Sequence, residues 1–203
     1  MTRLIVVLLL TAAPAFAEDG PSFDCAKAES SAEKLVCENA ELARLDRQVA
    51  DSYSAALAAA RGLDAGAAEA EDLLRATQRG WVKGRDECWK AADLTDCVTF
   101  AYQSRNNELV TQWMLHPPRA TAFWACDGNP ANEVVTMFYD TELPSVRFER
   151  GDSIDTGNLV RTASGSKYEG SFGRSIWIKG DAATYRDPDP DGTTYQCTLV
   201  REE

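Results

Sequence analysis

The sequence predicts an α+β protein in which a three-helix domain precedes a small antiparallel β-barrel, and three observations support that fold class. Before residue 115, apolar residues recur at helical spacing among Ala, Leu, Glu and Arg. After residue 122, short alternating apolar segments are separated by turn-forming residues. Between these regions, Pro117-Pro118 stops a helix and favours extended backbone. We therefore expect domains at 22–115 and 122–203, joined by a linker at 116–121.

The composition indicates an ordinary globular protein with a strongly acidic surface. The 203 residues include 32 acidic and 21 basic side chains, for a formal net charge of -11 at pH 7. Such a surface repels nucleic acid and anionic lipid and attracts basic proteins. We therefore expect a basic protein as partner and no nucleic-acid partner.

The first 17 residues have the three parts of a secretory signal peptide. Arg3 is followed by an apolar run from Leu4 to Leu10 and by an A-x-A cleavage site at Ala15-Phe16-Ala17. The run is shorter than the ~20 residues that span a bilayer, and no cysteine for lipid attachment follows the site. We expect cleavage near Ala17 and a soluble periplasmic or secreted protein of net charge -12, without stable membrane insertion.

Three helices are expected in the first domain, at 31–61, 67–89 and 94–115. The first carries an apolar stripe that runs from Leu35 to Leu57, and Ser30 or Ser31 can cap it. The second aligns Gln78, Trp81 and Arg85 on one face. Because buried polar side chains are usually hydrogen-bonded within the fold, we interpret this face as a buried polar network rather than a binding patch.

Six cysteines in an exported chain predict a disulfide framework, with all six bridged. A metal site is not expected, because C-x-x-C pairs are absent and the only histidine, His116, adjoins two prolines. Antiparallel helices would gather four cysteines at one end of the first domain. Three pairings are then open, and we prefer one of them: Cys37 with Cys88, and Cys25 with Cys97.

Eight strands are expected in the second domain. So many strands in fewer than ninety residues are typical of a small antiparallel barrel or sandwich. Their expected ranges are 122–126, 133–139, 145–149, 158–162, 166–169, 175–179, 182–186 and 194–200. Cys126 lies in the first strand and Cys197 in the last, so a bridge between them would tie the ends of the sheet.

Two short motifs in this domain match known chemical sites only in part. Asp187-Pro188-Asp189-Pro190-Asp191-Gly192 has the first half of a calcium-binding EF-hand loop, but Thr198 stands at the twelfth position, so we expect an acidic hairpin turn. Ser164-Gly165-Ser166-Lys167 fits the S-x-x-K spacing of serine acyltransferases. The other motifs of those enzymes are absent, so an enzyme is not expected.

The first domain contains a set of cysteine, Gln-x-x-Trp and Arg-Asp motifs that occur together: Cys37-Glu38-Asn39, Leu42, Leu45-Asp46, Gln78-Arg79-Gly80-Trp81, Arg85-Asp86, Cys88, Cys97, Tyr102 and Arg105. With these residues, the domain resembles the LprI-type lysozyme inhibitor family of helical export domains over residues 23–113.

The second domain contains two motifs in order, Ala163-Ser164-Gly165 with Tyr168, and Trp177 with Lys179-Gly180 and Ala183, between Trp124-Ala125-Cys126-Asp127 and Cys197-Thr198-Leu199. With these motifs, the domain resembles the family of membrane-bound lysozyme inhibitors of C-type lysozyme over residues 122–200. The resemblance implies that Ser164 and Lys179 enter the lysozyme cleft, beside Gly165, Tyr168 and Gly180. Ser164 and Lys179 are 15 residues apart, which is one more than the family pattern has. The alternation of this segment by itself predicts a strand, a hairpin loop and a strand, with Tyr168 and Trp177 in the core.

These inferences converge on an exported, non-enzymatic inhibitor of C-type lysozyme that needs no cofactor. The alternative is a non-inhibitory envelope module that binds proteins through its helical domain. A serine enzyme of the S-x-x-K type is the third hypothesis.

Overall fold

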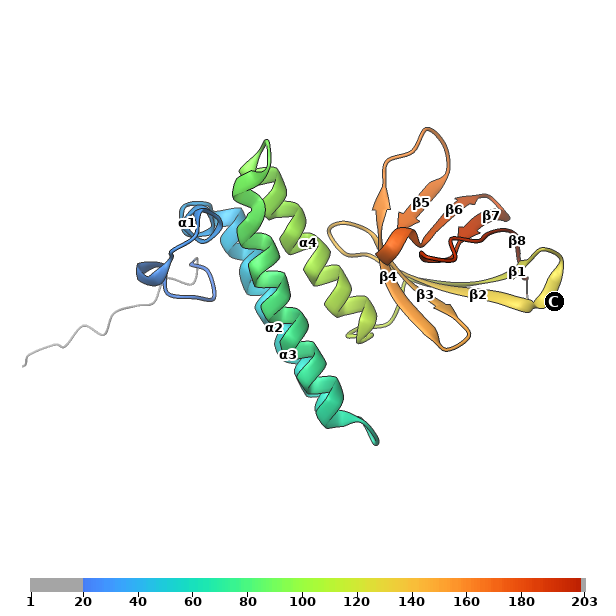
Figure 1. Ribbon diagram of the computed structural model, residues 1–203, viewed down its shortest axis with the longest axis horizontal. Helices are drawn as coiled ribbons and strands as arrows, with labels where there is room; N and C mark the ends of the chain where they lie inside the picture. Colours follow the sequence, from blue (N-terminus) through green and yellow to red (C-terminus); the bar gives the residue numbers. More distant parts are fainter. Residues whose placement is uncertain (1–19, 202–203) are drawn as a thin grey trace, which may run out of the picture.

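A computed structural model describes residues 20–201, and it shows helices in the N-terminal half and a β-barrel in the C-terminal half (Figure 1). The expected signal peptide lies outside the described residues. The helices are α1 (Ser31–Glu38), α2 (Ala40–Arg61), α3 (Ala67–Asp86) and α4 (Leu94–Gln112), with short 3₁₀ turns at Cys25–Lys27 and Glu87–Lys90. Within residues 20–201, no helix is long and apolar enough to cross a membrane.

The expected first helix is in fact two helices, because two capping side chains lie close together in the sequence. Ser30 begins α1 with a capping box, in which its hydroxyl accepts from Glu33 N and the Glu33 carboxylate accepts from Ser30 N. Asn39 has extended backbone, and its side chain accepts from the amides of Glu41 and Leu42 at the start of α2. The apolar stripe continues past Asn39, so its period alone did not show the break.

The helical core contains a continuous polar network as well as apolar side chains. Tyr102 is fully buried, and its hydroxyl donates to Asp46 Oδ1 at 2.9 Å and accepts from Arg85 Nη1 at 2.8 Å. Arg85 also donates to Asp86, while Trp81 Nε1 donates to the Ala101 carbonyl at 3.1 Å. This arrangement confirms the interpretation of the Gln78 to Arg85 face as a satisfied structural network.

The preferred pairing of the first four cysteines is wrong, although all six cysteines are bridged as expected. The disulfides join Cys25 to Cys37 and Cys88 to Cys97. Each bridge closes a local turn, because the break at Asn39 leaves Cys37 on a short helix beside the Cys25 turn, and Cys88 faces Cys97 across the α3–α4 connection. The expected Cys126–Cys197 disulfide is confirmed.

The C-terminal half is a closed barrel in which every strand is antiparallel to its neighbours, and β1 pairs with β8. The strands are β1 (Ala120–Cys126), β2 (Asn129–Tyr139), β3 (Ser145–Arg150), β4 (Ser153–Val160), β5 (Ser166–Glu169), β6 (Ser175–Lys179), β7 (Ala182–Arg186) and β8 (Thr194–Leu199). Cys126 and Cys197 are direct partners in the β1–β8 register. The barrel is filled by inward side chains that include Trp124, Phe148, Ile176 and Tyr185.

Strand β4 begins at Ser153, five residues before its expected start at 158. Its first half is polar and lacks the apolar alternation that marks the other strands. Gly157 is needed there, since a Cβ at this position would lie 2.7 Å from Phe148 Cε2. A glycine inside a strand therefore marks close packing rather than a loop.

Helix α4 lies beside β3 and β4 (Figure 1). The side-chain contacts between them are polar. Asn107 is 2% exposed, and its Nδ2 donates to the Leu143 carbonyl at 2.6 Å and to Asn158 Oδ1 at 2.7 Å. Asn158 Nδ2 in turn donates to Ser104 Oγ at 3.2 Å. Arg147 Nη1 donates to the Gln112 carbonyl at 2.8 Å, at the end of α4 where a positive charge is favoured. The two halves are thus held together by buried hydrogen bonds.

The linker between the halves is short and makes its own contacts. His116 packs edge-on against Tyr139, with ring centroids 5.6 Å apart. Arg119 N donates to the Phe138 carbonyl at 2.8 Å, so the β-sheet hydrogen bonding starts one residue before β1. These contacts leave the connection little freedom.

Candidate functional site

The two motifs singled out in the barrel sequence meet at one end of the barrel. Ser164 and Gly165 lie in the loop between β4 and β5, and Lys179 and Gly180 lie at the end of β6 and the turn to β7. Strand β6 pairs with β5 from Ser166 opposite Ile178. This pairing brings the loop and the turn side by side.

Gly165 fixes the loop against β6. Its φ is +70°, and a Cβ at this position would lie 2.2 Å from the Ile178 carbonyl oxygen and 2.9 Å from Lys179 Cγ. Only glycine accepts both the left-handed backbone and so close an approach. The side chain of Lys179 therefore runs directly over the backbone that follows Ser164.

Trp177 holds both halves of the site together. Its Nε1 donates to the Ser164 carbonyl at 2.8 Å, which anchors the loop. The Trp177 ring also makes a cation–π contact with the Lys179 ammonium, whose Nζ lies 3.6 Å from the ring centroid. The sequence-based placement of Trp177 in the core is wrong, because its side chain is only half-buried and lies on the outer face of β6.

The alternation of side chains along β6 indicates that Trp177 points outward. Ile176 is fully buried in the barrel, so Trp177 and Lys179, at odd positions of the same strand, share the opposite face. Tyr168 does belong to the core, at 9% exposure. It supports the site from inside the barrel and offers little surface for contact with a partner.

The two polar tips of the site are free to bind. Ser164 and Lys179 are both exposed, and among residues 20–201 the Ser164 hydroxyl has no hydrogen bond. Lys179 makes no ion pair within the same residues. Shallow hollows flank Trp177, one lined by Val160–Ala163 with Lys167 and the other by Lys179, Ala182–Thr184 and Gln196.

The geometry does not support Lys167 as a base for Ser164. Lys167 Nζ donates to Glu169 Oε1 at 2.5 Å, and Lys167 pairs in register with Trp177 on the outer face of the barrel. A general base must lie within hydrogen-bond reach of its nucleophile. The S-x-x-K spacing here is therefore part of a strand and its loop.

The acidic motif at Asp187 to Gly192 forms the connection between β7 and β8, as expected for a hairpin turn. Arg150 binds Asp187, and Arg186 Nη2 donates to Asp189 Oδ1 at 2.7 Å. Burial raises the pKa of Asp187, but the hydrogen bond and charge of Arg150 outweigh it and hold that pKa below its ordinary value. Both carboxylates thus serve to fasten the turn, and the described residues hold no cluster of metal ligands.

The helical half has one apolar groove that a partner could use under the alternative hypothesis. It lies between α3 and α4 and is lined by Leu73, Leu74, Thr77, Leu109, Trp113 and neighbouring residues. Leu73 is 66% exposed there. The Gln78 to Arg85 face offers fewer free polar groups to a partner, because its polar side chains already form hydrogen bonds within the fold.

Both halves match known families of lysozyme inhibitors. Residues 25–109 match the family model "Lysozyme inhibitor LprI", and residues 124–194 match "Membrane-bound lysozyme-inhibitor of c-type lysozyme". The chain is also 34% identical over 102 residues to proteins named "Lipoprotein LprI" from Mycobacterium bovis and Mycobacterium tuberculosis. That alignment covers 50% of this chain and 46% of each relative, so the chain spans about half the length of the curated relatives it matches. Both resemblances drawn from the motifs are confirmed, in the expected order along the chain.

Proposed function

We propose that this protein is an exported, non-enzymatic inhibitor of C-type lysozyme, and that it blocks the active-site cleft with the barrel end carrying Ser164 and Lys179. The observation that carries the proposal is the arrangement of Lys179, whose ammonium rests on the ring of Trp177 beside the exposed Ser164 loop. The family matches of both halves support the general role of lysozyme inhibitor.

The chemistry of the target explains why a lysine and a serine suit this task. A lysozyme cleaves glycosidic bonds with two carboxyl groups in a cleft, one a proton donor and the other ionised. The Lys179 ammonium can pair with the ionised carboxylate, and the Ser164 hydroxyl can bind the second carboxyl group. Charge-assisted hydrogen bonds inside a cleft closed to water are among the strong ones.

The fold keeps these two side chains ready to bind. Gly165 and Trp177 fix the loop backbone, and the cation–π contact holds Lys179 near one position before the partner arrives. A side chain ordered in advance loses less conformational entropy on binding. Inhibition therefore needs no rearrangement of the barrel.

The overall charge favours the encounter with such a target. C-type lysozymes are strongly basic, whereas this chain has a formal net charge of -11, or -12 after the expected cleavage near Ala17. Opposite net charges raise the association rate more than the final affinity. Lys179 thus pairs with a carboxylate in the cleft, while the acidic surface around it attracts the basic enzyme.

Substitution of Lys179 and Ser164 tests the proposal in lysozyme inhibition assays. Lys179→Ala should weaken inhibition by about 2 to 5 kcal/mol, because it leaves a carboxylate unpaired in a partly dehydrated cleft. Ser164→Ala should cost nearer 1 kcal/mol. Both side chains are exposed on the surface of the barrel, so the melting temperature should change little.

Lys27→Ala is the matched control, because it removes the same charge from an exposed side chain in the helical half. It should leave inhibition unchanged, which separates a contact of Lys179 from an effect of net charge. If the Lys179→Ala, Ser164→Ala double variant inhibits as well as the parent, the barrel end is not the inhibitory element. The groove between α3 and α4 then becomes the leading candidate.

A further inference from the structure

The polar junction between the two halves sets the direction of α4 relative to the candidate site. Arg147 contacts the C-terminal end of α4 and pairs in register with Thr156 of β4, whereas Asn158 contacts Ser104 near the middle of the helix. Moving toward the N-terminus of α4 therefore means moving along β4 toward Val160. Just beyond Val160 lies the loop that carries Ser164.

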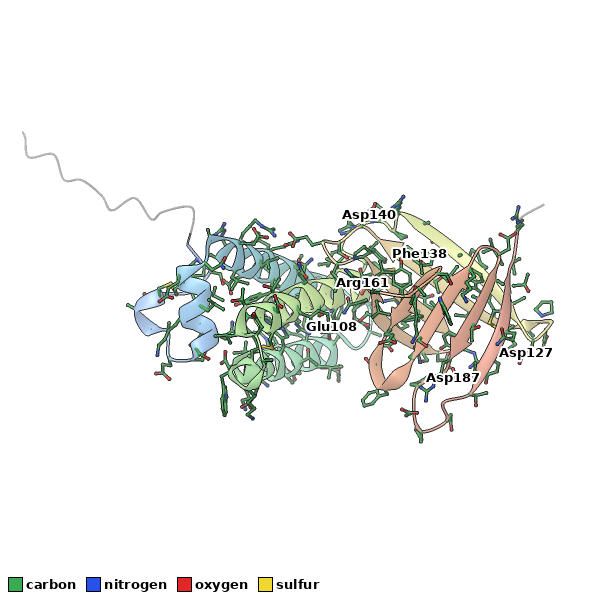
Figure 2. The ribbon with its side chains drawn as sticks, turned by 90° about the horizontal axis from the view of Figure 1, so that it is seen from above. Glu108, Asp127, Phe138, Asp140, Arg161 and Asp187 are labelled. Atoms are coloured by element: carbon green, nitrogen blue, oxygen red, sulfur yellow. A yellow bond between two sulfur atoms is a disulfide. The ribbon has the colours of Figure 1, made fainter. Side chains whose placement is uncertain are left out.

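Both figures agree that the N-terminal half of α4 and the end of β4 near Val160 lie toward the same side of the protein. The β4–β5 loop and the α3–α4 connection lie on the same side of the molecule, at the top of Figure 1. In Figure 2, seen from above, Arg161 at the start of that loop lies at the boundary between the helices and the barrel. The N-terminal half of α4 and the Ser164 loop thus flank the same end of the protein.

The side of α4 that faces the barrel is covered near Ser104 and Asn107, but the same side is exposed nearer the N-terminus of the helix. Phe100 lies one turn before Ser104 and seven residues before Asn107, so helical spacing places it on the same face. It is nevertheless 57% exposed. Asp96 continues this face one turn further, and Asp93 is the N-cap of α4, where its Oδ1 accepts from Asp96 N at 2.9 Å. Within residues 20–201 neither carboxylate forms an ion pair. We call Asp93, Asp96 and Phe100 the α4 stripe.

Ideal helix and strand spacings put Phe100, the nearest member of the α4 stripe, within one protein footprint of the candidate site. Phe100 is about 6 Å along the helix axis from Ser104, and Val160 is about 7 Å along the strand from Asn158. In the register, Lys167 lies between Val160 and Trp177, so about 10 Å separates Val160 from Trp177 across two strand spacings. A standard interface covers about 800 Å² per partner, which corresponds to a disc of roughly 16 Å radius.

We propose that the α4 stripe is a second part of the lysozyme-binding surface, so that one lysozyme molecule contacts the barrel end and α4 together. This inference rests on the proposed function, which names the partner. An exposed phenylalanine near two carboxylates that form no ion pair within residues 20–201 suits a basic protein, because the aromatic ring supplies buried area and the carboxylates match its charge. A second copy of this chain fits less well, since its net charge is equally negative.

The junction makes the two parts of this surface a fixed unit. Asn107 is almost fully buried and bonds both Leu143 and Asn158 of the barrel half. Arg147 adds a bond to the Gln112 carbonyl at the end of α4, so side chains from both halves hold the helix against the barrel. Lysozyme would therefore meet the barrel end and the α4 stripe in one rigid arrangement.

The test is the affinity of the full chain for a C-type lysozyme, measured by surface plasmon resonance for variants of the α4 stripe. Phe100→Ala should weaken binding about tenfold, as for a central aromatic contact. Asp96→Lys should slow association several-fold at low salt and less at high salt. Phe172→Ala, at an even more exposed phenylalanine in the short 3₁₀ turn Ser171–Gly173 after β5, is the matched control and should stay within twofold of the parent.

A Phe100→Ala affinity within twofold of the parent, with an unchanged melting temperature, would overturn the inference. Lys179→Ala in the same experiment separates the two proposals. If Lys179→Ala weakens binding and Phe100→Ala does not, the barrel end binds alone and only the α4 stripe is excluded. If Lys179→Ala binds like the parent, the proposed function fails and the shared surface fails with it.

Discussion

The helical half and the barrel differ in how they treat buried polar groups and in how they use disulfides. In the helices, the Tyr102 hydroxyl connects Asp46 and Arg85, and both local disulfides link residues 12 and 9 positions apart. In the barrel, Trp124 Nε1 donates to Thr136 Oγ1 at 2.9 Å, the buried Tyr139 hydroxyl has no hydrogen-bond partner among residues 20–201, and one disulfide links residues 71 positions apart. The helical core is therefore tied by a side-chain network, whereas the barrel relies on its strand ladder and one long-range disulfide.

Removal of disulfides should produce the largest effect and should expose this difference. On the chain-entropy model, loss of the Cys126–Cys197 bridge costs about 4 kcal/mol, and loss of the Cys88–Cys97 bridge about 3 kcal/mol. The longer loop matters more because it restricts the unfolded chain more. Urea unfolding of the two double Cys→Ala variants measures both costs, and an equal or reversed order would contradict the comparison.

A matched pair of tyrosines tests the polar contrast more finely. Tyr102→Phe should destabilise the protein by about 1 to 3 kcal/mol, because Asp46 and Arg85 each lose a buried partner. Tyr139→Phe removes a similarly buried hydroxyl that has no partner among the described residues, so it should be close to neutral or slightly stabilising. Thermal melts of both variants, in the same buffer, give the comparison directly. Equal losses would mean that the Tyr139 hydroxyl is satisfied in solution.

Local sequence signals predicted much of each half because local physics decides their elements. Capping residues and apolar periodicity located the helices, and alternation with turn residues located the strands, except for the early starts of β2 at Asn129 and β4 at Ser153. The Cys126–Cys197 pair followed from its place in the first and last strands. The pairing of the other four cysteines failed because Asn39 ends α1, a break that an unbroken apolar stripe conceals.

What the sequence could not supply was the contact between the halves. Asn107, Arg147 and Asn158 are polar residues far apart in the chain, and nothing in their spacing marks them as buried partners. The same limit applies to Trp177, whose outward position follows from alternation but whose bond to Ser164 depends on the loop conformation. Ser164 and Lys179 could be named from motifs, whereas their support by Trp177 and Gly165 required the structure.

The smallest expected effect is a loss of stability in acid, to which each half contributes through a different carboxylate. In the helices, the backbone amide of Glu29 is the main cause that holds the pKa of Glu33 below its ordinary value; burial opposes it, and the Ser30 amide adds to it. In the barrel, burial of Asp187 is outweighed by its bond to Arg150, so its pKa is lowered as well. A carboxylate with a lowered folded-state pKa stabilises the fold above its unfolded pKa, and this contribution disappears as the pH falls through the folded value.

The melting temperature should therefore be flat near neutral pH and fall below about pH 4, where unfolded carboxylates begin to bind protons. Glu33→Gln and Asp187→Asn should each flatten part of that fall, since neither variant can gain a proton at the substituted position. Salt should separate the two contributions. The Asp187 share depends on the charge of Arg150 and should shrink at 1 M salt, whereas the Glu33 share depends first on an amide hydrogen bond and should persist. Melts recorded between pH 2.5 and 7 (chosen to span the carboxyl range) at low and high salt check this, and an equal salt response in both variants would contradict the assigned causes.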